Sequence, residues 1–281
     1  MSELMDAVQL GPLVISAPRF YAGLGLLVLI AVAEVLARTA RRDGAGFDPG
    51  WAWTAAAAVF IGARLGFVFG NASYYLSDPL GVFKVWQGGF SPWWGVAAGA
   101  VVVAVAVARD KVNLRQAALP VAAALSVWLA VPYVTDRLDD RVIALPNEVF
   151  QRLEGGTFEF AGRSGKPVVL NLWATWCGPC QRELPHLARA AQDWPEIDII
   201  YLNQGESADV IRAYLLDHEE VVLEDVLLDP RQRTGIAMGS FGLPTTYFFA
   251  GNGEHFSTQV GELSGPALTR EIGRLVSAAE P

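Results

Sequence analysis

Two cysteines three positions apart are the residues of this sequence whose type and spacing most directly indicate chemistry. Cys177 and Cys180 are the only cysteines of the chain. They follow a continuous apolar run at 168–173, which is typical of a buried strand, and they open a segment that can be helical. Strand, turn and helix together place a dithiol at the N-terminus of a helix.

That position gives the two thiols different roles. The amides and the macrodipole of a helix favour an anion at the first turn, so Cys177 is expected to lose its proton more easily than a free thiol. The helix brings Cys180 to the same side one turn later, where it can attack a mixed disulfide on Cys177. Cys177 is therefore the predicted nucleophile, and Cys180 is the predicted resolving thiol.

Two other interpretations of the cysteine pair are weaker. A structural disulfide with this spacing closes too small a loop to restrain the unfolded chain much. A zinc site needs further ligands, and in a chain without another cysteine His186 alone cannot complete the coordination shell. The sequence therefore predicts neither a metal nor another cofactor.

The residues around the pair resemble a known family. Trp176 followed by Cys-Gly-Pro-Cys looks like thioredoxin, and the segment Leu-Pro-Thr-Thr at 243–246 resembles the cis-proline segment that faces the dithiol in that fold. Asn171 stands where thioredoxin has a buried aspartate. A glutamate three residues after the second cysteine, here Glu183, resembles instead a feature of the membrane-anchored TlpA/ResA type of extracytoplasmic thiol-disulfide protein. The resemblance covers about 142–281 and implies a thioredoxin-like α/β domain.

This resemblance also implies roles for three residues near the dithiol. Pro244, in the cis form, would lie across from Cys177 and present the preceding backbone to a substrate strand. Trp176 would give an apolar contact that shields the thiolate from water, unless it serves only in packing. Glu183 would tune the thiols, as in related reductases, or else would be a solvated surface acid.

The dipeptide between the cysteines indicates the direction of electron flow. Gly178-Pro179 is the reducing type found in thioredoxin, whose reduction potential is about −270 mV, against about −120 mV for the oxidant DsbA. Together with the TlpA/ResA-like surroundings, this dipeptide predicts a reductase of periplasmic protein disulfides that receives electrons from a membrane donor of the DsbD kind.

The elements that must hold the site follow the order of a thioredoxin-like sandwich. One helix is expected from the dithiol to about residue 191, with further helices at 207–218 and 268–276. Strands are expected at 158–160, 168–173, 198–203, 243–249 and 255–260, the last two as a hairpin. This domain is expected to occupy 148–281, after a short linker at 135–147.

Composition places the rest of the chain in a membrane. The chain has 281 residues, of which 52% are hydrophobic, which is too apolar for an ordinary soluble protein. About 20 apolar residues in a helix cross the hydrocarbon of a bilayer. Four stretches qualify as helical spans, at about 13–37, 51–70, 90–108 and 117–134, so 1–134 is the predicted membrane region. The formal charge of −8 argues against nucleic acid as a partner.

Positive charges in the connections between these spans predict their orientation. Arginines 38, 41 and 42 lie between the first two spans, and Arg109, Lys111 and Arg115 lie between the last two. The other connection offers only Lys84. Basic loops stay in the cytoplasm, so both chain ends are expected outside and the dithiol in the periplasm of a bacterial inner membrane protein.

The spans carry a second resemblance. Blocks at 62–69, 75–80 and 83–91 look like the N-terminal half of prolipoprotein diacylglyceryl transferase. This resemblance implies that Arg64 lies in a phospholipid headgroup site, whereas an arginine that snorkels or pairs within the bundle would have a structural role. That family continues with a histidine needed for activity, where this chain has Trp93. The membrane region is therefore predicted to be chiefly an anchor.

Two other classes of function remain open. A membrane enzyme of phospholipid and prolipoprotein diacylglyceryl transfer with an accessory redox domain would use both halves of the chain. A binding or chaperone module would keep full function without the thiols, which separates it from the oxidoreductase, whereas the transferase is tested by lipid transfer in Cys177→Ser.

Overall fold

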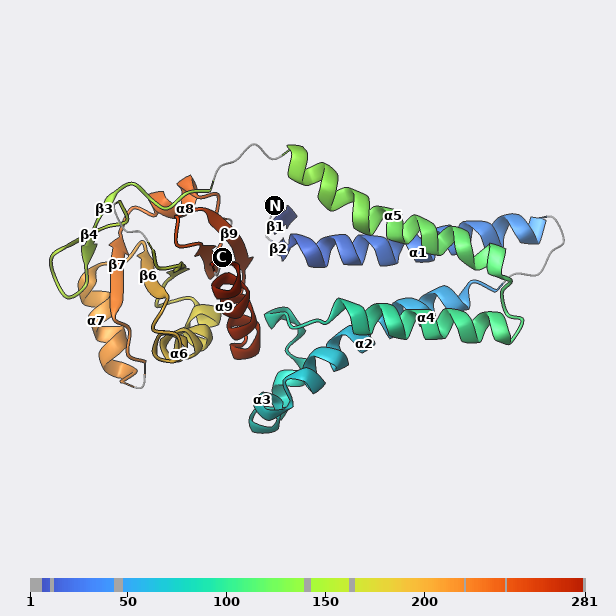
Figure 1. Cartoon of the computed structure of the whole chain (residues 1–281), viewed down its shortest axis with the longest axis horizontal. Coiled ribbons are helices and arrows are strands. Elements are labelled where there is room, and N and C mark those ends of the chain that lie inside the picture. Colours follow the sequence, from blue (N-terminus) through green and yellow to red (C-terminus); the bar gives the residue numbers. More distant parts are fainter. Residues whose placement is uncertain are drawn as a thin grey trace. The chain divides into compact units, whose positions relative to one another are not determined.

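The computed structural model describes residues 7–10, 13–42, 48–138, 143–161, 165–219, 221–240 and 242–279. The chain divides into two compact units, one mainly of long helices and one built on a β-sheet. Figure 1 shows the helices and strands of each unit.

The helical unit contains four apolar helices. They are α1 (Ala17–Arg42), α2 (Gly50–Gly70), α4 (Pro92–Ala108) and α5 (Leu114–Leu138). Among the described residues, α1, α2 and the part of α5 up to Thr135 are long and apolar enough to cross a membrane, and α4 is a shorter apolar helix. Between α2 and α4 lie the short helix α3 (Ala72–Ser77) and the 3-10 helices η1 (Pro79–Phe83) and η2 (Val85–Gln87).

Glycines and a polar contact hold these helices together. A Cβ at Gly62 of α2 would stand 2.5 Å from the Cβ of Ala98, and one at Gly95 of α4 would stand 2.8 Å from the carbonyl oxygen of Val59. Helices α2 and α4 can therefore pack this closely only because these positions carry no side chain, as is common between helices in lipid. The hydroxyl groups of Tyr21 and Thr135, 2.9 Å apart, link α1 to α5.

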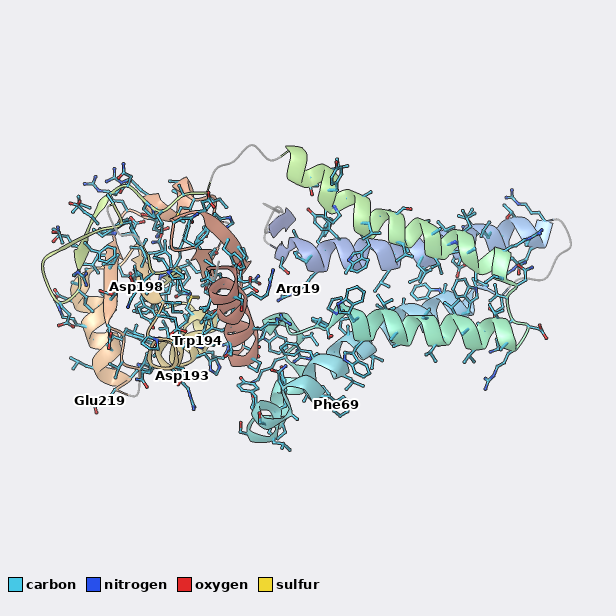
Figure 2. All side chains as sticks on the ribbon, in the orientation of Figure 1. Arg19, Phe69, Asp193, Trp194, Asp198 and Glu219 are labelled. Carbon is cyan, nitrogen blue, oxygen red and sulfur yellow. A yellow bond between two sulfur atoms is a disulfide. The ribbon has the colours of Figure 1, made fainter. Side chains whose placement is uncertain are left out.

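The outer faces of the helices carry large apolar side chains. Phe69 of α2, labelled in Figure 2, is 74% exposed. Leu27, Val101 and Leu129, from three other helices, are exposed as well. A soluble protein would bury such groups, whereas a membrane presents a hydrocarbon phase to them.

Two expectations for this unit are corrected. The first helix begins at Ala17 rather than at residue 13, because Leu13–Ser16 forms strand β2, antiparallel to β1 (Ala7–Leu10). Helix α5 spans Leu114–Leu138 rather than about 117–134, because it extends beyond the apolar run at both ends. Residues 135–138 of the expected linker belong to α5, and 139–142 lie outside the described residues.

The second unit is built on a seven-stranded mixed sheet with the order β4-β3-β7-β6-β5-β8-β9. The strands are β3 (Val149–Arg152), β4 (Thr157–Glu159), β5 (Val168–Trp173), β6 (Asp198–Gln204), β7 (Asp225–Asp229), β8 (Thr245–Phe249) and β9 (His255–Val260). The helices are α6 (Gly178–Asp193), α7 (Ala208–Asp217), α8 (Arg233–Ala237) and α9 (Gly265–Ala279). This sheet confirms the predicted thioredoxin-like α/β class.

Strand β5 is the centre of the sheet. All six of its residues are buried, because it pairs in parallel with β6 and antiparallel with β8 and is covered on both faces. On one face α6, α7 and α9 contribute Leu184, Ile211 and Ile272 to a common core. On the other face Phe158, Phe160 and Met238 pack against Leu170 and Leu172. The end of β5 is therefore a fixed platform for the residues that follow it.

Besides β1 and β2, three elements of this unit were not predicted from the sequence. They are β3, which pairs with β4 at an edge of the sheet, β7 beside β6, and the short helix α8. Strand β3 has only four residues, and β7 has three apolar residues between two aspartates. Segments this short give no periodicity that distinguishes a strand from a loop.

Candidate active site

The two cysteines form a disulfide at the N-terminus of α6. Cys177 is the N-cap residue of this helix, and its sulfur accepts a hydrogen bond from the backbone N–H of Cys180 at 3.3 Å. The Cα atoms of the two residues are 5.2 Å apart. Gly178 is the first residue of the helix and Pro179 is the second, a position where the missing N–H of proline costs no hydrogen bond. The predicted strand, turn and helix are thus confirmed.

An exposed tryptophan and a cis-proline lie near the disulfide. Trp176 is 69% exposed, so its indole does not belong to the core. The Leu243–Pro244 peptide bond is cis. Thr245, next in the chain, pairs with Leu172 near the end of β5, which puts Pro244 at the same end of the sheet as the dithiol.

Glu183, one helical turn after Cys180 in α6, lies at the centre of a buried polar network. Its Oε1 accepts hydrogen bonds from the Nδ2 of Asn171 and from the hydroxyl of Thr246, both at 3.1 Å. Its Oε2 accepts from the backbone N–H of Leu263 at 3.0 Å. Asn171 and Thr246 face each other across β5 and β8, so the sheet itself holds two of the donors. The alternative that Glu183 is a solvated surface acid is therefore wrong.

Burial changes the proton affinity of this carboxyl group. Burial raises the pKa of Glu183 to about 8, against an ordinary value of 4.5. The hydrogen bonds from Leu263 and Thr246 act in the opposite direction, because they stabilise the anion, and the nearby carboxylate of Glu262 raises the pKa further. A carboxyl group of this kind can bind and release a proton near neutral pH.

A second carboxylate, which the sequence analysis did not single out, fixes the loop before the dithiol. Glu206 accepts hydrogen bonds from the backbone N–H of Thr175 at 2.7 Å and from its hydroxyl at 2.5 Å. Asn203, at the end of β6, donates to the same carboxylate at 2.7 Å. The carbonyl of Thr175 accepts from Gln181 of α6 at 2.6 Å. The sequence signal that could have indicated Glu206 is its place just after β6, because β6 is parallel to β5 and the ends of parallel strands meet at one edge of a sheet.

The structure surrounds Arg64, in the helical unit, with backbone carbonyls. Its side chain is buried and donates to the oxygens of Val82, Gly89 and Gly81 at 3.0, 2.9 and 2.6 Å. These bonds tie the segment before α4 to helix α2. A role of Arg64 in binding a phospholipid headgroup remains a prediction.

In the described residues, no group of three or more His, Cys, Asp or Glu side chains is placed to hold a metal ion.

A dithiol at a helix N-terminus can exchange with another disulfide, and a cis-proline at the same sheet end leaves a backbone edge beside it. These features place the second unit among the thioredoxin-like thiol-disulfide oxidoreductases, with Cys177 and Cys180 as the redox pair. Two family models match the chain in succession. Residues 6–138 match prolipoprotein diacylglyceryl transferase, and residues 143–254 match the AhpC/TSA family. The chain thus joins a transferase-like region to an oxidoreductase region, as the two sequence resemblances predicted.

Curated relatives agree with the second match. The thiol-disulfide oxidoreductase ResA of Halalkalibacterium halodurans is 29% identical over 52% of this chain and 86% of its own length. The thiol:disulfide interchange protein HelX of Rhodobacter capsulatus is 30% identical over 41% of this chain and 64% of its own length. A solved thiol:disulfide interchange protein of the thioredoxin family from Chlorobium tepidum is 20% identical, with a TM-score of 0.43 over 49% of this chain and 99% of that one.

Proposed function

We propose that the protein is a membrane-anchored, periplasmic reductase of protein disulfides. The observation that carries the proposal is the Cys177–Cys180 pair at the N-terminus of α6, one helical turn before the buried carboxyl group of Glu183, whose pKa burial raises to about 8. The relatives named for thiol-disulfide exchange and the apolar helices support the two halves of this assignment.

The reaction begins with the reduced dithiol. The Cys177 thiolate attacks one sulfur of a client disulfide, the client S–S bond breaks, and one client sulfur leaves as a thiolate that takes up a proton. A mixed disulfide now joins Cys177 to the client. Cys180 gives up its proton and attacks the sulfur of Cys177, which breaks the mixed disulfide and forms the disulfide seen here, and the second client sulfur leaves as a thiolate that takes up a proton. Two electrons pass to the client, and a membrane dithiol donor of the DsbD kind returns them to Cys177 and Cys180.

Three neighbouring residues assist these steps. Glu183 lies one helical turn after Cys180, and its carboxylate receives the proton that the buried Cys180 must lose before it attacks. Pro244 leaves the preceding backbone open to pair with an extended client segment. The exposed indole of Trp176, next to Cys177, gives an apolar contact that shields the thiolate from water.

The direction of electron flow has a direct test. A redox titration of the dithiol is expected to give a potential close to the value of about −270 mV for thioredoxin, because Gly178-Pro179 separates the cysteines. A value near that of DsbA, about −120 mV, would make the protein an oxidant and would overturn the direction while leaving the exchange chemistry intact.

We also propose that four spans hold the dithiol on the periplasmic side of the inner membrane. Arg38, Arg41 and Arg42 close α1, and Arg109 and Lys111 lie between α4 and α5, so both basic connections belong on the cytoplasmic side. Alkaline phosphatase is active only after export, so a fusion after Ala279 is expected to be active. A fusion after Asp110 is the matched control and is expected to be inactive. The reverse pattern would place the dithiol in the cytosol.

The match to prolipoprotein diacylglyceryl transferase favours a second candidate, a membrane enzyme of phospholipid and prolipoprotein diacylglyceryl transfer with an accessory redox domain. In this candidate Arg64 would bind the phospholipid headgroup. It requires lipid transfer to persist in Cys177→Ser, because the transfer itself would not use the redox pair. The position of Trp93 where that family has its histidine weighs against it, since proton transfer needs a titratable side chain.

A further inference from the structure

An ion pair beside the dithiol has no part in the reaction described so far. Arg182 of α6 donates from Nε to both carboxylate oxygens of Glu262, at 3.0 and 3.1 Å, and from Nη2 to Oε2 at 2.6 Å. The Glu262 side chain is only 3% exposed, whereas that of Arg182 is 52% exposed. A buried carboxylate thus fixes a cation whose other edge faces solvent, and the forked contact fixes its orientation as well as its distance.

The fixed guanidinium lies over the start of α6. A Cβ built on Gly178 would stand 3.6 Å from the Nη1 of Arg182. Gly178 is bonded to Cys177, so the positive charge lies beside the residue that carries the nucleophilic sulfur. A positive charge close to a thiol favours its ionised form.

The same pair also supports the buried carboxyl group. Glu262 directly precedes Leu263, whose backbone N–H donates to Glu183. Adjacent residues of α6, Arg182 and Glu183, therefore hold adjacent residues of the segment between β9 and α9. The ion pair keeps that segment against the helix, and with it the amide that contacts Glu183.

We propose that Arg182 and Glu262 are positioning residues of the dithiol. Glu262 orients the Arg182 guanidinium above Gly178, where its charge stabilises the Cys177 thiolate. The proposal rests on the function above, in which Cys177 is the nucleophile. It also explains how the thiolate is stabilised although the carboxylates of Glu206 and Glu262 and the buried carboxyl group of Glu183 are placed around the active-site helix and loop. The field of the helix N-terminus acts together with Arg182.

The test measures thiolate formation in the reduced full-length protein in detergent. Iodoacetamide alkylates the thiolate, and mass spectrometry of peptides follows the modification of Cys177 from pH 4 to 10. Arg182→Met is expected to move the pH midpoint of the alkylation rate upward by about half a unit to one unit, which corresponds to a roughly three- to tenfold lower thiolate fraction below the midpoint. Arg182→Lys keeps the charge and is expected to recover part of the shift.

A matched control lies on the same helix. Arg189 contacts Asp193 at 3.6 Å, with 82% of its side chain exposed, two turns further from the dithiol. Arg189→Met removes the same charge and is expected to leave the midpoint of the native protein unchanged. If Arg182→Met shifts the midpoint no more than this control does, the positioning role of Arg182 is wrong.

A double-mutant cycle tests the part of Glu262. In a Glu262→Gln background the forked contact is lost, so Arg182→Met is expected to produce less than half of the shift that it produces in the native protein. An equal shift in both backgrounds would show that Arg182 acts without Glu262. Failure of the proposed function would be seen in a different measurement, because the native protein would then not cycle between dithiol and disulfide. The alkylation series reports on the positioning residues whether or not a client is reduced.

Discussion

Replacing Cys180 by alanine is expected to convert the protein into a trap for its clients. Cys177 still attacks a client disulfide, but the thiol that resolves the mixed disulfide is gone. Cys177 and Cys180 are the only cysteines of the chain, and their sulfurs are bonded to each other in the structure, so no other protein thiol can take over. Covalent complexes of the protein with clients should therefore accumulate in cells and separate again on reduction. Non-reducing electrophoresis and mass spectrometry would show them and identify the clients.

Two variants make this result specific. Cys177→Ser is expected to give no complexes and to lower disulfide reduction to the uncatalysed background, because an alcohol forms no mixed disulfide. Cys177→Ser combined with Cys180→Ala is the matched control for proteins that associate without a covalent bond. Complexes that survive in the double variant, or full cellular function in Cys177→Ser, would favour a binding or chaperone module over an oxidoreductase.

The centre of the fold was predictable because its signals are local. The run at 168–173, the two cysteines and the Gly-Pro dipeptide lie within residues 168–180, and the structure places them as strand β5, the helix N-cap and the first turn of α6. Pro244 was found by its surroundings in the sequence, and its peptide bond is cis. The strand and the helix that carry the dithiol are each specified by residues close together in the sequence, so they could be predicted.

The environment of Glu183 was not predictable in the same way. Its position in α6 leaves both a buried and a solvated orientation open. The choice depends on Thr246 and Leu263, which are distant in the sequence and reach Glu183 only when β8 and the segment after β9 fold against α6. Glu206 was missed for a similar reason, because its partner Thr175 belongs to another strand end. Contacts between separate elements leave little trace in either local sequence.

The membrane region shows the same division. Hydropathy located the four apolar helices, since burial in lipid acts on every turn of a span. It did not locate their ends, as in α5, where the helix continues into polar residues to Leu138. Arg64 illustrates the limit most clearly, because its carbonyl partners belong to η1 and to the segment before α4, whose path only the structure shows.

The buried carboxyl group leads to a prediction about pH. If Glu183 receives the proton of Cys180, the release of a client from the mixed disulfide on Cys177 should accelerate as Glu183 ionises. The rate is therefore expected to rise through an apparent pKa of about 8, the value to which burial raises this group. Glu183→Gln cannot accept the proton, so it should lose this rise and resolve the mixed disulfide at least about tenfold more slowly at pH 8. Stopped-flow measurement with a preformed mixed disulfide separates this step from the attack of Cys177.

Stability provides an independent check on the same group. The folded state holds its proton up to about pH 8, whereas the unfolded state releases it near 4.5. The unfolded state therefore binds fewer protons between these values, and the free energy of unfolding falls as pH rises through this window. Glu183→Gln should remove this part of the decline, and Glu159→Gln, which changes an exposed carboxylate on β4, should leave it in place. Thermal unfolding of the oxidised protein at pH 5 and pH 8 measures the difference. An unchanged decline in Glu183→Gln would show that Glu183 is already ionised in the folded protein, and it could then not be the group that titrates near pH 8 during resolution.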